Sequence, residues 1–300
     1  MTIAPAQPRN FWKGHGTQND FIIINDPGVV LPLDSGTVGA LCDRQRGIGA
    51  DGLLRVARAG SLVDAGVLTG LGEGIAADDL FMDYRNGDGS IAEMCGNGVR
   101  VFAHFCRVSG LTDADEFVVG SRAGARRVHL HSVTQTDADV SVAMGPVRRG
   151  VTSSAMIAGH AYLGLAVDVG NPHLACVVPG LTHSELAAVD FTAGAAFDTA
   201  VFPDGVNVEL VTEPLDVGDS LLASMRVIER GVGETRSCGT GLVAAGSALL
   251  ASVQRDEGML RISVPGGRVE VAITDGGRSS TLRGPSRLVA RGELFDGALG

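Results

Sequence analysis

Two cysteines lie in matching turns of the sequence and have the chemistry of an acid and a base. Cys95 begins the segment Cys-Gly-Asn-Gly, and Cys238 begins the segment Cys-Gly-Thr-Gly. A helix-like run follows each segment, so both cysteines are predicted to stand at the N-terminus of a helix. The unpaired N–H groups of such a terminus bind carboxylate or phosphate. The helix dipole also stabilises a thiolate, which lowers the pKa of the cysteine below the ~8.5 of a free thiol.

Two thiols that face one carbon atom could invert a stereocentre without a cofactor. One thiolate would remove the α-proton from one face, and the other thiol would donate a proton to the opposite face. The two helix N-termini would stabilise the charge that develops on the adjoining carboxylate. A lone cysteine beside a tight turn is more simply a small buried residue, and we assign that packing role to Cys42, Cys106 and Cys176.

The surroundings of the two turns repeat as well. A strand-like run ends at Asn86 in the first half and at Glu229 in the second, nine residues before the respective cysteine. Further upstream, Asn19 and Asn171 each open a strand-like run. Three elements in the same order predict two homologous halves.

The elements that must hold these turns are predicted to be short strands with few helices, since the chain has 43 glycines and only 4% aromatic residues. Helix-like runs cover residues 35–44, 98–109, 181–189 and 241–251. Strand-like runs cover residues 21–25, 53–56, 80–84, 117–119, 140–143, 163–169, 174–178, 206–211, 224–229, 260–264 and 269–273. The small-residue segment 59–78 is predicted to be a surface excursion between two strands.

Composition excludes several classes of function. The net charge of −10 argues against nucleic acid and anionic membranes as partners. Lys13 is the only lysine, so a Schiff-base cofactor such as pyridoxal phosphate is not expected. The five cysteines include no CxxC pair, which argues against a structural zinc site or a disulfide scaffold. The N-terminus lacks a signal-peptide core, and the uncharged run 237–254 contains polar residues typical of a buried helix. We therefore expect a cytoplasmic protein without a metal or cofactor.

The motifs resemble those of the diaminopimelate epimerases, a family of cofactor-independent amino-acid epimerases of lysine and peptidoglycan precursor biosynthesis. MCGNGV at 94–99 and ERGVGETRSCGTG at 229–241 carry most of the resemblance. The other matching segments, in the family's order, are KGHGTQNDF at 13–21, GIGADGL at 47–53, YRNGDGS at 84–90, GNPH at 170–173, GVN at 205–207 and VPGG at 264–267.

The resemblance implies an α/β (α+β) fold of two pseudo-symmetric domains. Each would be a β-barrel-like sheet around a central helix, with the active site in the interdomain cleft. The domains would be 1–143 plus 284–300, which carries Cys95, and 144–283, which carries Cys238. The family further implies a homodimer that converts LL-2,6-diaminopimelate to the meso form.

Site residues follow from the same resemblance. Cys95 and Cys238 would be the acid and base, with His173 and Glu229 beside the thiols to tune them. The reacting carboxylate would bind at Gly96, Asn97, Gly239 and Thr240. The other substrate contacts would be Asn19, Asn86, Asn171, Asn207, Glu229 and Arg230. The chemistry is consistent, because arginine can hold a carboxylate in two parallel hydrogen bonds and asparagine can serve both ends of a zwitterion.

Three other functions remain open on the residues alone. A two-cysteine racemase for proline or hydroxyproline would use the same thiols, but it would not need the polar set for a second zwitterion. A non-catalytic redox switch would join Cys95 to Cys238 in a disulfide. A binding protein for dicarboxylic amino acids would tolerate the loss of both sulfurs.

Overall fold

The computed structural model describes residues 10–295, which form two compact units. The first unit comprises Asp20–Val142 together with the chain up to Gly16 and from Pro285. The second comprises Ala143–Gly284 and the short turn Thr17–Asn19.

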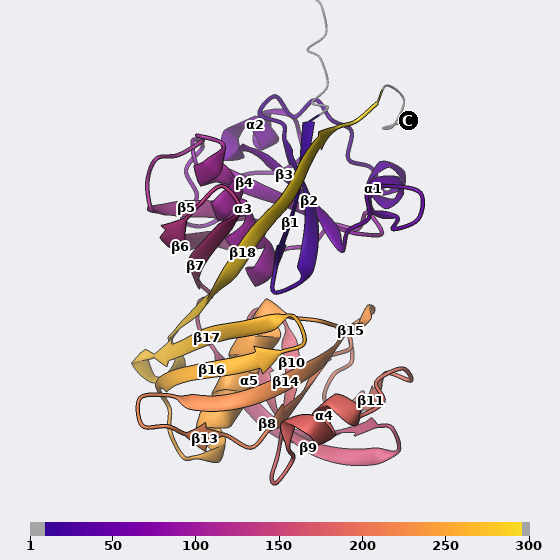
Figure 1. The fold of residues 1–300 in the computed structure, drawn as a ribbon, viewed down its shortest axis with the longest axis vertical. Coiled ribbons are helices and arrows are strands. Elements are labelled where there is room, and N and C mark those ends of the chain that lie inside the picture. Colours follow the sequence, from indigo (N-terminus) through magenta and orange to yellow (C-terminus); the bar gives the residue numbers. More distant parts are fainter. Residues whose placement is uncertain (1–9, 296–300) are drawn as a thin grey trace, which may run out of the picture. The chain divides into compact units, whose positions relative to one another are not determined.

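The first unit is a closed barrel of eight strands (Figure 1). The pairing runs β1–β2–β3–β4–β5–β6–β7–β18 and returns to β1. The strands are β1 (Asn10–Gly16), β2 (Asn19–Asn25), β3 (Gly52–Arg58), β4 (Leu80–Asn86), β5 (Glu116–Ser121), β6 (Gly124–Val133), β7 (Asp137–Ala143) and the later part of β18 (Ser279–Glu293). The helices are α1 (Ser35–Cys42), α2 (Ala59–Asp64) and α3 (Gly96–Val108).

Helix α3 forms the centre of this barrel. Its residues from Gly96 to Cys106 are all buried. Phe102 and Phe105 are fully buried, and the ring of Phe105 meets Trp12 of β1 edge-on at 4.9 Å between centroids. Burying each such ring contributes about 1.5–3 kcal/mol relative to leaving it in water. The start of α3 is therefore held rigidly by the barrel around it.

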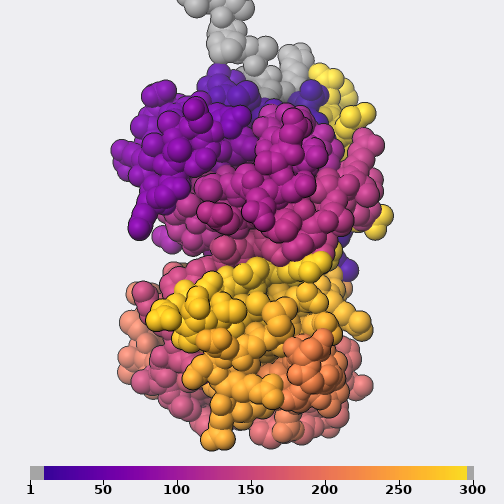
Figure 2. All heavy atoms as spheres, turned by 90° about the vertical axis from the view of Figure 1, so that its left-hand side faces the viewer, coloured from indigo at the N-terminus to yellow at the C-terminus, as the bar shows by residue number. Residues whose placement is uncertain are grey.

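The second unit repeats this plan around helix α5 (Gly239–Ser252), which contacts strands β9, β10, β12, β14, β16 and β17. The pairing runs β8–β9–β10–β12–β14–β16–β17–β18. These strands are β8 (Arg148–Ile157), β9 (His160–Asp168), β10 (Pro172–Val178), β12 (Asn207–Thr212), β14 (Leu221–Glu229), β16 (Gly258–Val264), β17 (Gly267–Thr274) and the early part of β18. Smaller elements are α4 (His183–Ala188), β11 (Ala195–Phe197), β13 (Leu215–Asp216), β15 (Gly233–Thr235) and the 3-10 turn η1 (Asp275–Gly277). The orange and yellow segments, from the later part of the chain, form much of the face of this unit that Figure 2 shows.

The two units share strand directions as well as order. Strand β2 runs parallel to β3 as β10 does to β12, and β4 runs parallel to β5 as β14 does to β16. The register places Asn86 opposite Gly52 and, by the same count, Glu229 opposite Asn207. This confirms the predicted α/β fold of two pseudo-symmetric barrels around central helices, and it confirms the repeat read from the sequence.

Residues 59–78 lie between β3 and β4 and are mostly exposed, as predicted, but the segment is anchored to the core. Ala59 and Leu62 of α2 are fully buried and pack with Ile75 and Phe81 in a small core cluster. The segment is rich in glycine and alanine, so its few anchoring side chains are too widely spaced to give a periodic signal. Strands β1, β6 and β8 were also not predicted, since charged residues, glycine and other polar residues interrupt their alternation. The part of β18 beyond residue 284 pairs with β1 in the first unit, as the family resemblance implied.

No helix among residues 10–295 combines the length and the apolar character needed to span a membrane. Helix α5, the segment that raised the question in the sequence, is a buried core helix as predicted.

Candidate active site

Cys95 caps the N-terminus of α3. Its backbone is extended, and its Sγ accepts a hydrogen bond from the N–H of Gly98 at 3.4 Å. The side chain is half-buried. The sulfur therefore lies at the positive end of the helix dipole, where a thiolate is stabilised.

Arg100 is a fully buried cation one turn along the same helix. Its Nη2 donates to Oδ1 of Asn97 at 2.8 Å, and its Nε donates to the carbonyl of Pro285 at 3.3 Å. Burial lowers the pKa of Arg100 to about 10, so it remains positively charged at neutral pH. The side chain of Asn97 is thus engaged with Arg100, and its backbone N–H is the group that would meet an anion at the helix start.

Asn86 ends strand β4 in the same unit. Its Nδ2 donates to Oγ of Ser90 at 2.9 Å, and Gly52 lies opposite it on β3. A side chain at position 52 would meet the backbone of Arg85 at 2.5 Å. The glycine therefore permits the close strand packing that places Asn86 near the turn before α3.

Cys238 caps α5 in the second unit and is more enclosed than Cys95, with only 7% of its surface exposed. Its Sγ lies 3.6 Å from the hydroxyl of Thr240. Burial raises the pKa of this thiol well above its usual value, and the nearby carboxylates of Glu229 and Glu209 raise it further. The cap alone would favour a thiolate, but here desolvation and negative neighbours favour the protonated thiol.

A chain of three polar side chains lies beside Cys238. Nδ1 of His173 on β10 is 2.7 Å from Oε1 of Glu209 on β12, and Nε2 of His173 is 3.0 Å from Oδ1 of Asn171. Both His173 and Glu209 are fully buried. A Cβ on Gly241 would be 2.6 Å from Oε1 of Glu209 and 3.4 Å from Sγ of Cys238, so carboxyl and sulfur flank the same glycine.

The end of β14 carries a second polar group. Oδ1 of Asn207 accepts a hydrogen bond from the backbone N–H of Arg230 at 2.8 Å. The Arg230 side chain is exposed, and its Nη1 donates to the carbonyl of Asp204 at 3.2 Å. Glu229 accepts a short hydrogen bond from the hydroxyl of Thr235. Arg230 is thus anchored at its backbone while its guanidinium remains near the surface.

Asn19 is brought toward this second group by the turn between β1 and β2. Oγ1 of Thr17 donates to Oγ of Ser237 at 2.7 Å, and Ser237 immediately precedes Cys238. Asn19 begins β2 two residues after Thr17. The predicted site residues therefore fall into two sets. Cys95, Gly96, Asn97 and Asn86 belong to the first unit, and Cys238, Gly239, Thr240, Asn19, Asn171, His173, Asn207, Glu229 and Arg230 belong to the second.

Glu209 is the residue of this group that the sequence reasoning missed. It is the third residue of a strand that begins Asn-Val-Glu, so it shares a face with Asn207. That alternation was visible in the sequence, but a single glutamate in a strand gave no reason to expect a buried partner.

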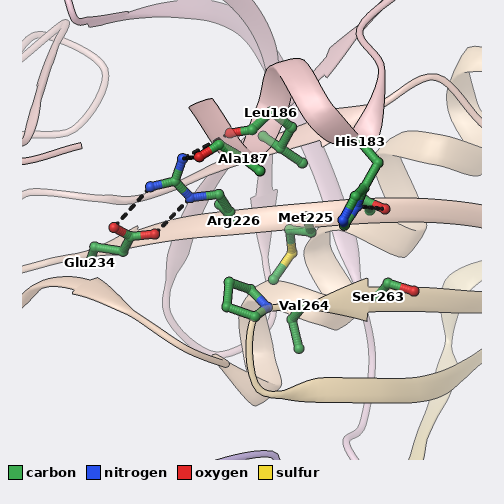
Figure 3. A pocket seen from close by; sticks show the side chains of 10 residues that line it. His183, Leu186, Ala187, Met225, Arg226, Glu234, Ser263 and Val264 are labelled. Atoms are coloured by element: carbon green, nitrogen blue, oxygen red, sulfur yellow. Dashed lines mark hydrogen bonds and ion pairs between the residues drawn. The ribbon is translucent and has the colours of Figure 1, made fainter. Parts of the chain in front are cut away.

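A separate pocket of about 430 Å³ lies in the second unit between α4, β14 and β16 (Figure 3). Arg226 and Glu234 form a two-bond ion pair on one side, at 2.7 and 3.0 Å, and Arg226 also donates to carbonyl groups at the end of α4. Those contacts stabilise the end of α4, and none of the predicted site residues lines the pocket. Among residues 10–295, no cluster of histidine, cysteine and carboxylate side chains is arranged to hold a metal ion.

The family model and highly similar sequences name one family. The family model described as diaminopimelate epimerase matches residues 11–150 and 165–289. A diaminopimelate epimerase of Rhodococcus erythropolis is 58% identical over 287 residues, which covers 96% of each chain. Among solved structures, a phenazine biosynthesis protein of the PhzF family from Bacillus anthracis has a TM-score of 0.68 at 12% identity, with 97% of this chain and 100% of that chain covered. A probable proline racemase from Agrobacterium radiobacter has a TM-score of 0.62 at 15% identity, with 97% and 96% covered, and both likenesses concern the fold alone.

Proposed function

The chain belongs to the diaminopimelate epimerase family, and from that premise we propose that it converts LL-2,6-diaminopimelate to the meso isomer without a cofactor. The reaction is a step toward lysine and peptidoglycan precursors. The observation that carries the proposal is the pair of cysteines that cap the central helices of two equivalent barrels.

In the proposed mechanism Cys95 and Cys238 act on opposite faces of one α-carbon. A thiolate Sγ takes the α-proton and becomes a thiol, and the electron pair left on carbon is delocalised into the adjoining carboxylate. The second thiol then gives its proton to the opposite face and becomes a thiolate. No atom is gained or lost, and the reverse reaction exchanges the roles of the two sulfurs.

The electrostatics described above suggest how the roles are divided at rest. Cys95 lies beside the positive end of α3 and the buried cation of Arg100, which favour its thiolate. Cys238 lies beside two carboxylates in a buried position, which favours its thiol. We therefore propose Cys95 as the resting base and Cys238 as the resting acid for the LL substrate.

The backbone N–H groups of Gly96, Asn97, Gly239 and Thr240 are proposed to bind the reacting carboxylate. These groups lie in the first turns of α3 and α5, at the positive end of each helix dipole, where an anion binds. Because they are fixed before substrate binds, they stabilise the charge that develops in the transition state without reorganisation.

The distal zwitterion of the substrate is proposed to bind the asparagines with Glu229 and Arg230. The exposed guanidinium of Arg230 can accept a carboxylate in a fork of two hydrogen bonds. Asn19, Asn86, Asn171 and Asn207 can serve both the ammonium and the carboxylate. A proline substrate would leave this set unpaired, which argues against the racemase alternative.

The single lysine supports a reaction independent of pyridoxal phosphate. Nζ of Lys13 lies 2.6 Å from the carboxylate of Asp20 and donates to the carbonyl of Gly49. An amine engaged in this way by a carboxylate and a carbonyl is not presented as the nucleophile that forms a Schiff base. We further propose a cytoplasmic homodimer that binds neither nucleic acid nor membrane, and light scattering of the purified protein tests its oligomeric state.

The deciding experiment is incubation of the reduced protein with LL-diaminopimelate in deuterated water. NMR should show deuterium at one α-carbon and accumulation of the meso isomer. Proline and hydroxyproline serve as parallel substrates. Turnover of either with none of diaminopimelate would favour the racemase, and no turnover of any substrate by the reduced protein would favour the redox switch or the binding protein.

A further inference from the structure

The buried pair Glu209–His173 raises a question of charge that the proposed mechanism leaves open. Both side chains are fully buried, and Oε2 of Glu209 accepts no hydrogen bond from any residue within 10–295. A buried carboxylate with so few donors needs a nearby positive charge. Two positive groups lie close to Glu209. One is the ring of His173 at 2.7 Å, and the other is the positive end of the α5 dipole at Gly241.

The neighbours of the His173 ring point to its protonation. Nδ1 faces a carboxyl oxygen, and Nε2 faces the amide oxygen of Asn171 at 3.0 Å. With Glu209 ionised, both neighbours are hydrogen-bond acceptors, and a neutral imidazole has only one N–H to donate. A ring with a hydrogen on each nitrogen satisfies both contacts.

We propose that Glu209, which lies close to Cys238, is a positioning residue that holds His173 as a doubly protonated imidazolium. The inference rests on the proposed function, in which His173 lies next to the reacting centre. Without a counter-charge a fully buried histidine would be neutral. The ring lies between Glu209 and Asn171, so an imidazolium presents one N–H to the carboxylate and the other to the substrate-binding asparagine.

The other charged and titratable groups around the pair are Glu229 on β14, Cys238 at the start of α5 and Cys176 on β10. Burial raises the pKa of Glu209, the ring of His173 opposes that rise, and Glu229 adds to it. Glu229 and the thiols contribute no positive charge. The imidazolium is therefore the one side-chain cation found against Glu209 in the described part of the second unit.

The first test observes the ring directly. In protein labelled with ¹⁵N-histidine, at pH 7.5–8 (roughly one unit or more above the unperturbed histidine pKa of about 6.5), His173 should show two protonated ring nitrogens, with His173→Gln used to assign its signals. Glu209→Gln keeps the volume but removes the charge, so one of the two protons should be lost. A singly protonated ring in the wild type would overturn the proposal, whether or not the protein turns over diaminopimelate.

The second test measures catalysis. Glu209→Gln should lower kcat/KM for diaminopimelate by about 10- to 100-fold above the histidine pKa and recover part of that loss at lower pH, where the ring is protonated again. Because Glu209 acts through the ring, Glu209→Gln should add little to the loss in a His173→Gln background. An additive double variant, or a loss independent of pH, would mean that Glu209 has only a structural role.

Leu210→Ala is the matched control. Leu210 is fully buried on the same strand but belongs to the core cluster on the opposite face, away from His173. It should lose stability without changing the pH profile or the protonation of His173. If wild-type protein fails on diaminopimelate while the ring is doubly protonated, the proposed function fails and the inference about Glu209 stands.

Discussion

The glycines three residues after each cysteine, Gly98 and Gly241, should respond oppositely to alanine. Both lie in the first turn of a central helix, and neither has a positive φ. In that conformation alanine is favoured over glycine by up to about 1 kcal/mol, because it loses less backbone entropy. The difference between the two positions must therefore come from what surrounds the added methyl group.

At Gly98 the added Cβ would meet Cys95 at 3.4 Å, Phe21 at 3.5 Å and Leu54 at 3.6 Å, which are ordinary packing distances. At Gly241 it would lie 2.6 Å from Oε1 of Glu209. That oxygen is held by His173, so it cannot move away without breaking a charge-assisted hydrogen bond. Overpacking of this kind costs about 1–3 kcal/mol, and the lost hydrogen bond about 1.5–3 kcal/mol.

Gly98→Ala should therefore unfold at or slightly above the wild-type temperature. Gly241→Ala should lose about 1–4 kcal/mol, at roughly 2–4 °C per kcal/mol for units of this size. Thermal and urea unfolding, followed by circular dichroism, measure both variants under the same conditions. Equal losses for the two variants, or a larger loss for Gly98→Ala, would refute the account of the two helix starts.

Three further predictions concern the cysteines and Arg230. Cys95→Ala and Cys238→Ala should each abolish epimerisation in the NMR assay while the protein stays folded, whereas Cys42→Ala should keep activity. More than a few per cent of wild-type activity in Cys95→Ala or Cys238→Ala would contradict the two-base assignment. Arg230→Ala should lower kcat/KM by about 30- to 1,000-fold, equivalent to about 2–4 kcal/mol, and should discriminate less than wild type against a substrate without the distal carboxylate; Arg230→Lys should also be impaired. Iodoacetamide at pH 8 should label Cys95 first, as followed by peptide mass spectrometry. Burial raises the pKa of Cys42 to about 11 and that of Cys176 to about 12, so about one in a thousand or fewer of these thiols is ionised at pH 8. Rapid labelling of Cys42 or Cys176 in the folded protein would contradict this order.

The helix starts were predictable because local sequence specifies them. A cysteine followed by Gly-x-Gly and an apolar run carries its own cap and turn, and the structure places both Cys95 and Cys238 at N-caps. The repeat was also visible, since equal spacings in two halves of one chain require no knowledge of contacts. Within each half, the end of the strand and the cysteine are nine residues apart, so each signal is local in the sequence.

Glu209 was not predictable in the same way. It meets His173 only because β10 and β12 pair in parallel, with His173 opposite Asn207. That register depends on the intervening α4 and its loops, not on a short motif. The hydrogen bond between Asn97 and Arg100 was not predictable for a similar reason, because the burial of Arg100 is evident only once the barrel closes around α3.

The pairing of β1 with the end of β18 has a consequence for biosynthesis. Asn10 pairs with Glu293 and Phe11 with Gly292, so nearly the first and last described residues are neighbours in one barrel. A ribosome adds about 5–20 residues per second, so the roughly 150 residues from β7 to the end of β18 take about 8–30 seconds, and the barrel around α3 stays open while the second is made. The unpaired edges of β1 and β7 are exposed to wrong partners during that interval. Nascent chains that stall before residue 279 would be the form most in need of chaperones, although the segment that carries Cys95 has long been complete.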